Sequence, residues 1–230
     1  NTETVGDPEL AVAVVLPSGV TVKSGSSCSR GLPTLSMYFL QSWQHWDGAV
    51  GMELTAALLD LCKGVAQPVI AIDGPAGGGK TTLAQNLALA FATSLSTNVI
   101  HMDDLYNGWS SPFDHHFTDA LRVATTSHQS SKRYSLSHFN WSKGDYGAAI
   151  EMPQAELLIL EGVGASHSLI RPHLTASIWI ELEPLQGLER VLTRDGEAIA
   201  SQMKNWLLQQ EQLFDEHQSM KAADFVLTTG

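Results

Sequence analysis

The chain has 230 residues, of which 43% are hydrophobic and 16% are charged, a balance typical of one globular domain with a sizeable core. Its formal net charge of −11 argues against a nucleic-acid backbone or an anionic membrane as the main partner. The two cysteines, Cys28 and Cys62, form no C-x-x-C pair and no metal-spaced cluster, which favours a reducing, cytoplasmic location. No apolar run is long enough to cross a bilayer, and Asn1 to Thr4 lack the basic residues that open a signal peptide.

Residues 1–65 are predicted to form an N-terminal extension, to which the sequence assigns no role. Two β-prone runs, Ala11 to Leu16 and Val20 to Lys23, flank a Pro-Ser-Gly turn and predict a hairpin. A Ser- and Gly-rich stretch from Lys23 to Pro33 favours a loop, and Leu35 to Trp46 shows no clean period. Gly51 to Val65 is predicted to be a helix, because its leucines recur at helical spacing.

The next stretch joins a β-branched apolar run, Val69 to Ile72, which predicts a strand, to a glycine-dense turn and then to a helical pattern. Gly74, Gly79, Lys80 and Thr81 match the pattern G-x-x-x-x-G-K-[ST], in which backbone N–H groups surround a phosphate. Lys80 should reach the β- and γ-phosphates, and the Thr81 hydroxyl should contact Mg²⁺. The ATP-binding residues predicted from this pattern are Gly74, Pro75, Ala76, Gly77, Gly78, Gly79, Lys80, Thr81 and Thr82.

Apolar runs and helical patterns alternate through the rest of the chain. The runs that predict strands are Asn98 to Met102, Leu157 to Leu160, Ile178 to Ile180 and Phe225 to Leu227. The patterns that predict helices are Phe117 to Thr125, Pro184 to Leu192 and Ala198 to Gln218, and residues 107–150 are otherwise expected to be mostly irregular. This alternation predicts an α/β fold, with a parallel sheet between two layers of helices.

Acidic residues follow two of the predicted strands. Asp103 and Asp104 come directly after Met102, and Glu161 follows Leu160. Because ligands of open parallel sheets bind beyond the carboxyl ends of the strands, these residues should lie beside the phosphate loop. Asp103 can take or orient the proton of an acceptor hydroxyl, and Asp104 and Glu161 can hold Mg²⁺ through water. Ordinary roles in a helix cap or a turn are the alternatives for these carboxylates.

Arg190 and Arg194 lie one helical turn apart, so both can point from one face of the predicted helix. Cationic side chains on a closing segment can neutralise the charge that develops during phosphoryl transfer. A solvated helix with ordinary surface arginines is the alternative. In that case Asp195 is expected to pair with one of them.

The middle of the chain is rich in histidines and aromatic residues. His115, His116, His128 and His138 match no zinc spacing, so they are interpreted as polar loop residues. The aromatic residues Tyr134, Phe139 and Trp141 either form a stacking wall for a planar group or pack the loop that carries them.

Over about residues 66–230 the motifs resemble, in order, those of uridine kinase-like P-loop kinases of the compact bacterial branch. The segments that carry the resemblance are Ala71-Ile72-Asp73-Gly74, His101-Met102-Asp103-Asp104-Leu105-Tyr106, Phe139-Asn140-Trp141, Leu160-Glu161-Gly162-Val163 and Arg190 to Asp195. The resemblance implies that Asp103 acts on a nucleoside 5′-hydroxyl and that Tyr106 lies near the sugar or base. It also implies a lid around residues 186–205 that carries Arg190 and Arg194. Phe139-Asn140-Trp141 stands where the family has Y-D-[FW], so both the Tyr and the Asp are replaced.

The sequence therefore predicts an ATP- and Mg²⁺-dependent kinase that phosphorylates a hydroxyl of a small molecule, with a nucleoside as one candidate. No nucleic-acid or membrane partner is expected, and a homo-oligomer is left open. A nucleoside monophosphate kinase is one alternative, because Ile72 to Gly77 also resembles the start of cytidylate kinases. Its phosphate acceptor would need more cations, and the middle region offers only Arg122, Lys132 and Arg133. A nucleotide-dependent regulatory module that signals through residues 1–67 is the other alternative.

Overall fold

A computed structural model of the chain describes residues 14–15, 21–22 and 48–228. In the N-terminal extension, β1 (Val14–Val15) pairs antiparallel with β2 (Thr21–Val22), as the predicted hairpin requires. The expected loop at residues 23–33 and the segment at residues 35–46 lie outside the described residues. Within the described part of the chain, no helix combines the length and the apolar character needed to cross a membrane.

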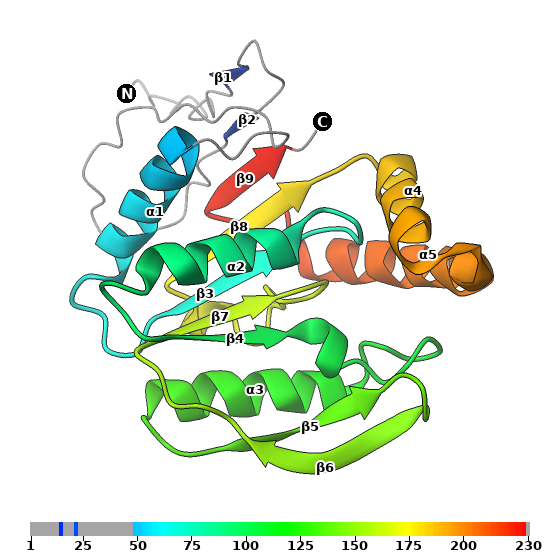
Figure 1. Cartoon of the computed structure of the whole chain (residues 1–230), viewed down its shortest axis with the longest axis horizontal. Helices are drawn as coiled ribbons and strands as arrows, with labels where there is room; N and C mark the ends of the chain where they lie inside the picture. The colour runs from blue at the N-terminus through cyan, green and yellow to red at the C-terminus, as the bar shows by residue number, and fades with distance from the viewer. Residues whose placement is uncertain (1–13, 16–20, 23–47, 229–230) are drawn as a thin grey trace, which may run out of the picture.

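The centre of the molecule is a five-stranded sheet in the order β4-β7-β3-β8-β9, in which every neighbouring pair is parallel (Figure 1). Its strands are β3 (Val69–Asp73), β4 (Thr97–His101), β7 (Leu157–Glu161), β8 (Ala176–Glu181) and β9 (Phe225–Thr228). All five predicted strands are thus confirmed, with ends that move by one or two residues. Because β3 is central, the loop that follows it has strand ends on both sides.

Helices cover both faces of this sheet (Figure 1). One face packs on α1 (Gly48–Cys62) and α2 (Lys80–Phe91), and the other on α3 (His115–Gln129) and α5 (Ala200–His217). The strands supply both cores by alternation: Ile70 and Ile72 of β3 point to α1 and α2, and Val69 and Ala71 point to α3 and α5. The predicted three-layer α/β architecture is therefore confirmed.

Short elements complete the chain at the two ends of the sheet. The 3₁₀ turn η1 (Met102–Asp104) follows β4, and η2 (Arg171–His173) precedes β8. Helix α4 (Pro184–Asp195) follows β8 and is joined to α5 by the turn η3 (Glu197–Ile199). The helices predicted at Pro184 to Leu192 and Ala198 to Gln218 are confirmed, with the first extended to Asp195 and the second starting at Ala200.

The prediction that residues 107–150 are mostly irregular is wrong. Helix α3 extends well beyond the predicted Phe117 to Thr125, because the Asp114 carboxylate caps its start by accepting from the N–H groups of His116 and Phe117. A separate antiparallel hairpin, β5 (Ser135–Asn140) with β6 (Asp145–Glu151), follows α3. Nearly all of β6 is exposed, and the buried residues of β5, Leu136 and Phe139, are three positions apart. Neither strand therefore shows the alternation of buried and exposed residues that predicts a half-buried strand.

Candidate active site

The glycine-rich loop leaves the central strand β3 and leads into α2, as the phosphate-loop pattern requires. Gly79 adopts a left-handed conformation (φ 86°) directly before the first residue of α2, Lys80. The Lys80 side chain is buried, and its Nζ donates to the Pro75 carbonyl at 2.8 Å. Burial lowers the pKa of Lys80, against the charges of Glu161, Asp73 and Asp103, which raise it. The loop therefore holds a buried cation among three carboxylates.

Thr81 and Glu161 meet at the ends of neighbouring elements. The Thr81 hydroxyl donates to Glu161 Oε1 at 3.0 Å, and His101 Nδ1 bonds the same carboxylate oxygen. Glu161 is 4% exposed, whereas His101 is half-buried at the end of β4, and the hydrogen bond to Glu161 raises the pKa of that histidine. The predicted metal residues Thr81 and Glu161 are therefore in direct contact.

The neighbouring aspartates Asp103 and Asp104 have different surroundings. The Asp103 side chain is exposed at the cleft, but nearby protein atoms still desolvate its carboxyl group in part, and this raises its pKa. The charge of Glu161 adds to the rise, and Lys80 and Arg194 oppose it. Asp104 faces the hairpin instead, with its Oδ2 3.7 Å from Nδ1 of His138. Asp103 is thus grouped with Lys80 and Glu161, while Asp104 as a metal ligand stays a prediction.

Helix α4 lies directly against the phosphate loop. A Cβ on Gly187 would come within 2.6 Å of the Ala76 carbonyl oxygen, so only glycine allows this approach. Arg190 reaches the loop from this helix, with its Nη1 3.5 Å from the Gly77 carbonyl oxygen. Arg194 makes two hydrogen bonds of 2.7 Å to Asp195, the pair that the sequence predicts for an ordinary surface helix. The hydrogen bond to Asp195 raises the pKa of Arg194, and the charges of Asp103 and Glu161 add to the rise, so this arginine lies near the carboxylates of the cleft as well.

The tip of the hairpin carries the aromatic part of the cleft. The Trp141 indole N–H donates to the Asp103 carbonyl at 2.9 Å, and the ring remains 40% exposed. Phe139 is nearly buried and packs on Trp141 and Tyr146, while Asn140 accepts three hydrogen bonds within its own turn. Within the Phe139-Asn140-Trp141 element, Trp141 therefore presents the open ring surface, and Phe139 and Asn140 support the hairpin.

The predicted contact of Tyr106 with a substrate is wrong for this structure. The Tyr106 side chain has no exposed surface, and its hydroxyl donates to the Val163 carbonyl at 2.9 Å. Its ring packs against Phe117 and Trp206 in the core beneath the cleft. Burial raises its pKa far above the ordinary value. Tyr106 thus supports the cleft from below and does not line it.

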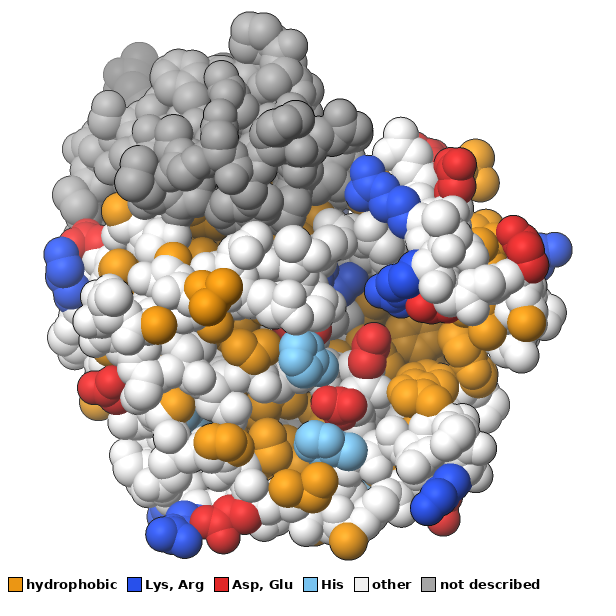
Figure 2. Space-filling model, viewed as in Figure 1, with side chains coloured by type: hydrophobic (Ala, Val, Ile, Leu, Met, Phe, Trp, Pro, Cys, Tyr) orange, Lys and Arg blue, Asp and Glu red, His pale blue; other side chains and the backbone are white. Residues whose placement is uncertain are grey.

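Figure 2 shows the face of the molecule onto which the cleft opens. Lys and Arg side chains gather toward α4 and inside the hollow, and Asp, Glu and His side chains gather at its centre. Hydrophobic side chains lie beside them, toward the hairpin. The cleft thus presents cations on one side and carboxylates with aromatic surface on the other.

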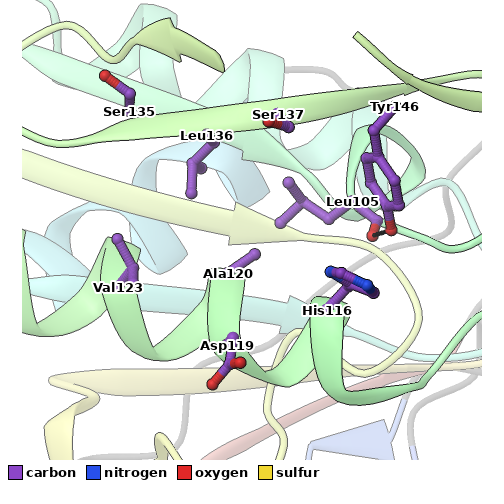
Figure 3. A pocket seen from close by; sticks show the side chains of 9 residues that line it. All are labelled: Leu105, His116, Asp119, Ala120, Val123, Ser135, Leu136, Ser137 and Tyr146. Atoms are coloured by element: carbon purple, nitrogen blue, oxygen red, sulfur yellow. Dashed lines mark hydrogen bonds between the residues drawn. The ribbon is translucent and has the colours of Figure 1, made fainter. Parts of the chain in front are cut away.

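A separate pocket of about 300 Å³ lies between α3 and the hairpin (Figure 3). Its walls come from both elements and from the residue that follows η1: Leu105, His116, Asp119, Ala120, Val123, Ser135, Leu136, Ser137 and Tyr146. None of these nine residues is among the predicted site residues. Two of them adjoin that site, since Leu105 follows Asp104 and Tyr146 packs on Phe139.

The histidines of the middle region do not converge on one site. His128 is buried and bonds the Pro68 carbonyl, while His138 faces Asp104. His115 and His116 do lie near Asp114, with donor atoms within 4.8 Å of one another. Both oxygens of that carboxylate are already used, by the cap of α3 and by the amide of Asn107. The interpretation of these histidines as loop residues is wrong, because His115, His116 and His128 lie on α3 and His138 lies on β5.

No protein-family model and no curated protein matches the sequence. Two solved structures match the fold with TM-scores of 0.53. A possible uridine kinase from Bacillus stearothermophilus is 19% identical, and the match covers 76% of this chain and 99% of that one. A candidate fructose transport system kinase from Silicibacter sp. TM1040 is 17% identical, with 76% and 96% covered. The fold is that of the P-loop kinases. At this identity the likeness concerns the P-loop kinase fold alone.

Three site residues escaped the sequence analysis: His101, Gly187 and Gln210. The same strand-end rule that selected Asp103 also reaches His101, two residues earlier, so a sequence signal for it exists. Gln210 of α5 is buried and accepts from the N–H of Ala76 at 3.2 Å, and Gly187 of α4 touches the same residue. These contacts join segments more than 100 residues apart, and no local pattern marks them.

Proposed function

We propose that this protein, which has the fold of the P-loop kinases, transfers the γ-phosphoryl group of ATP to a hydroxyl of a small molecule. The observation that supports this most is the grouping of the buried Lys80, the Thr81–Glu161 pair and Asp103 at adjoining ends of β3, β4 and β7. The loop and the first turn of α2 would hold the triphosphate through N–H groups that have no partner within the helix. Lys80 would neutralise its β- and γ-phosphates.

The residues present fit a magnesium ion. A hydroxyl and a carboxylate oxygen, 3.0 Å apart at Thr81 and Glu161, are hard oxygen donors of the kind that Mg²⁺ prefers. When bound, the ion would neutralise charge on the β- and γ-phosphate oxygens. Asp104 lies in η1, directly after β4, and we propose it as a third ligand that would bind the ion through water.

Asp103 is the proposed base. A carboxyl group with a raised pKa is a better proton acceptor than an ordinary aspartate, which suits the deprotonation or orientation of an alcohol. Arg190 and Arg194 of α4 would neutralise charge that builds up on the transferred group. The exposed face of Trp141, fixed beside Asp103 by its indole N–H, would form one wall for the acceptor.

The test is a coupled ATP-turnover screen over nucleosides, sugars, pantothenate and nucleoside monophosphates, repeated with Asp103→Asn. We expect one class of alcohol to raise turnover above the water background, and the variant to lose about 10²–10⁴-fold of it while still binding a fluorescent ATP analogue. Turnover that no acceptor raises, in a protein that binds the nucleotide, would contradict the kinase function and favour a regulatory module.

The nucleoside monophosphate kinase alternative has less support. It needs cations that face the acceptor phosphate, but Arg122 pairs with Asp119 and Arg133 pairs with Glu151, both in exposed positions. The first pair lies on α3 and the second at the base of the hairpin, away from its tip at Trp141. An alcohol is therefore the acceptor that the cleft favours.

A further inference from the structure

Asp73 is the last residue of β3 and directly precedes the phosphate loop. Its side chain has no exposed surface, and its two carboxylate oxygens accept four hydrogen bonds. Oδ1 accepts from the N–H groups of Gly74 at 2.7 Å and Gly164 at 2.9 Å. Oδ2 accepts from the N–H and the hydroxyl of Ser166 at 3.0 and 2.7 Å. One carboxylate thus joins the phosphate loop to the loop that follows β7.

These hydrogen bonds begin where the pairing of the sheet ends. The last paired residues of β3 and β7 are Ile72 and Glu161, and the Gly162 N–H still bonds the Ile72 carbonyl at 3.1 Å. Beyond this point both chains turn away through glycines with positive φ, 137° at Gly74 and 138° at Gly162. Backbone pairing therefore cannot hold the two loops together here, and the Asp73 side chain takes its place.

An ionised carboxylate is the group that this position requires. All four partners are donors, so an amide in the same place would turn its NH₂ group toward at least one N–H. Removing a carboxylate from water is unfavourable unless it is fully bonded, and here the four donors and the nearby cations Lys80 and Arg171 compensate. The four donors around this buried side chain therefore favour a charged group at this position.

We propose that Asp73 is a positioning residue for phosphoryl transfer, which holds Glu161 at the correct distance from Lys80 and Thr81 by joining the two loops. This rests on the proposed function of the same cleft. Asp73 touches none of the reacting groups. If it is lost, sheet pairing still holds Glu161 beside Ile72, but the phosphate loop is no longer bonded to the loop after β7, so the position of Lys80 and Thr81 relative to Glu161 is less well fixed. We therefore expect the loss of Asp73 to reduce the gain in nucleotide affinity that Mg²⁺ provides.

The chain contains a matched control. At the other end of the sheet, Asp224 Oδ2 accepts from the N–H and the hydroxyl of Ser177, both at 2.8 Å. These are the same two bonds that Asp73 makes with Ser166, but Asp224 is exposed, and its serine lies at the start of β8, away from the cleft. Asp224→Asn and Ser177→Ala therefore remove equivalent hydrogen bonds without reaching the proposed site.

The experiment measures the affinity of each variant for a fluorescent ATP analogue with and without Mg²⁺, well below its Tm. We take the ratio of the affinity with Mg²⁺ to the affinity without it. We expect Asp73→Asn to lower this ratio about 10-fold or more, as is found for groups that orient metal ligands. Asp224→Asn should leave the ratio unchanged. The milder pair, Ser166→Ala against Ser177→Ala, decides the question if Asp73→Asn does not fold. There we expect a loss of about 3-fold for Ser166→Ala alone.

The outcomes separate the two proposals. If the unmodified protein binds the analogue with a clear Mg²⁺ dependence and both variants of the Asp73 arrangement keep it, the positioning role is wrong and the kinase function stands. If the unmodified protein shows no Mg²⁺-dependent binding, both proposals fail. A fall in Tm with an unchanged ratio also overturns the proposal, since it would indicate a purely structural carboxylate.

Discussion

The phosphate side and the acceptor side of the cleft differ in what holds their groups in place. On the phosphate side, Lys80 and Glu161 are buried, and side chains of β3, α4 and α5 make hydrogen bonds to the backbone of the phosphate loop. On the acceptor side, the hairpin tip is held on η1 and the residue after it by two aromatic side chains, Trp141 and Tyr146, which donate to backbone carbonyls. The first side depends on the core of the sheet, and the second on a few contacts of an exposed hairpin.

This difference has a physical consequence. Groups buried at strand ends move only if the sheet moves, so the phosphate side should tolerate few substitutions. Trp141 and Tyr146 bond backbone atoms, and the side-chain contact of His138 is with Asp104 and not with Asp103, so the surface of the hairpin tip can change without disturbing the Asp103 carboxylate. The acceptor side is therefore the part of the cleft where substitutions should be tolerated best.

The largest effect is expected from Lys80→Ala, which removes the buried cation of the phosphate side. The change leaves Glu161, Asp73 and Asp103 without their nearest compensating charge, and we expect nucleotide affinity to fall by about 2–5 kcal/mol. Titration with a fluorescent ATP analogue measures this. Lys63→Ala, at an exposed lysine paired with Asp60, is the control and should bind normally. Unchanged affinity in Lys80→Ala would remove the basis for distinguishing the two sides.

Gly187→Ala tests how tightly α4 is held on the phosphate loop. Alanine ordinarily stabilises a helix relative to glycine, but here its Cβ would lie 2.6 Å from a backbone oxygen. We expect the clash to dominate and to lower the free energy of unfolding by about 1–3 kcal/mol, with weaker nucleotide binding. Gly147→Ala, where the nearest atom is at 3.6 Å, is the control in a denaturant titration. A more stable Gly187→Ala variant would show that α4 moves freely on the loop.

Trp141→Ala tests the acceptor side. It removes one hydrogen bond and the ring surface next to Asp103, and we expect kcat/KM for the acceptor found by the screen to fall about 10-fold. Nucleotide affinity should change less than about 2-fold, because the phosphate side is held independently. Trp141→Phe keeps an aromatic ring but loses the N–H group, so its kcat/KM should lie between those of the unmodified protein and Trp141→Ala. Equal losses of nucleotide and acceptor binding would argue that the two sides are coupled.

The smallest effect concerns acid stability at a site far from the acceptor side. His167 and His217 lie in contact, with ring centroids 3.8 Å apart, and burial lowers the pKa of His167 from 6.5 to about 4. Between these values the unfolded chain binds more protons than the folded one, so the free energy of unfolding falls as the pH drops from 6.5 to 4. We expect about 1 kcal/mol after solvent screening at this half-buried site. Denaturant titrations at pH 7 and pH 5 measure this change, and the free energy of unfolding should differ less between the two pH values in His167→Gln than in the unmodified protein.

Much of the phosphate side is readable from the sequence. The pattern from Gly74 to Thr81 specifies a loop before a helix, and the strand-end rule selects Asp103 and Glu161, which the structure places beside that loop. Both inferences use local order alone. The acceptor side was predicted less well, since Tyr106 is buried and the hairpin carries no alternation of apolar residues.

Sequence order by itself determined the phosphate loop, the five strands and the acids that follow them, because each is specified by residues close together along the chain. Tertiary structure alone decided which of those groups meet. The contacts of Asp73 with Ser166, of Gln210 with Ala76 and of Trp141 with Asp103 join segments that are distant in sequence. They form only when the sheet brings its strand ends together, and a hydrogen bond across such a distance leaves no periodic trace in the sequence.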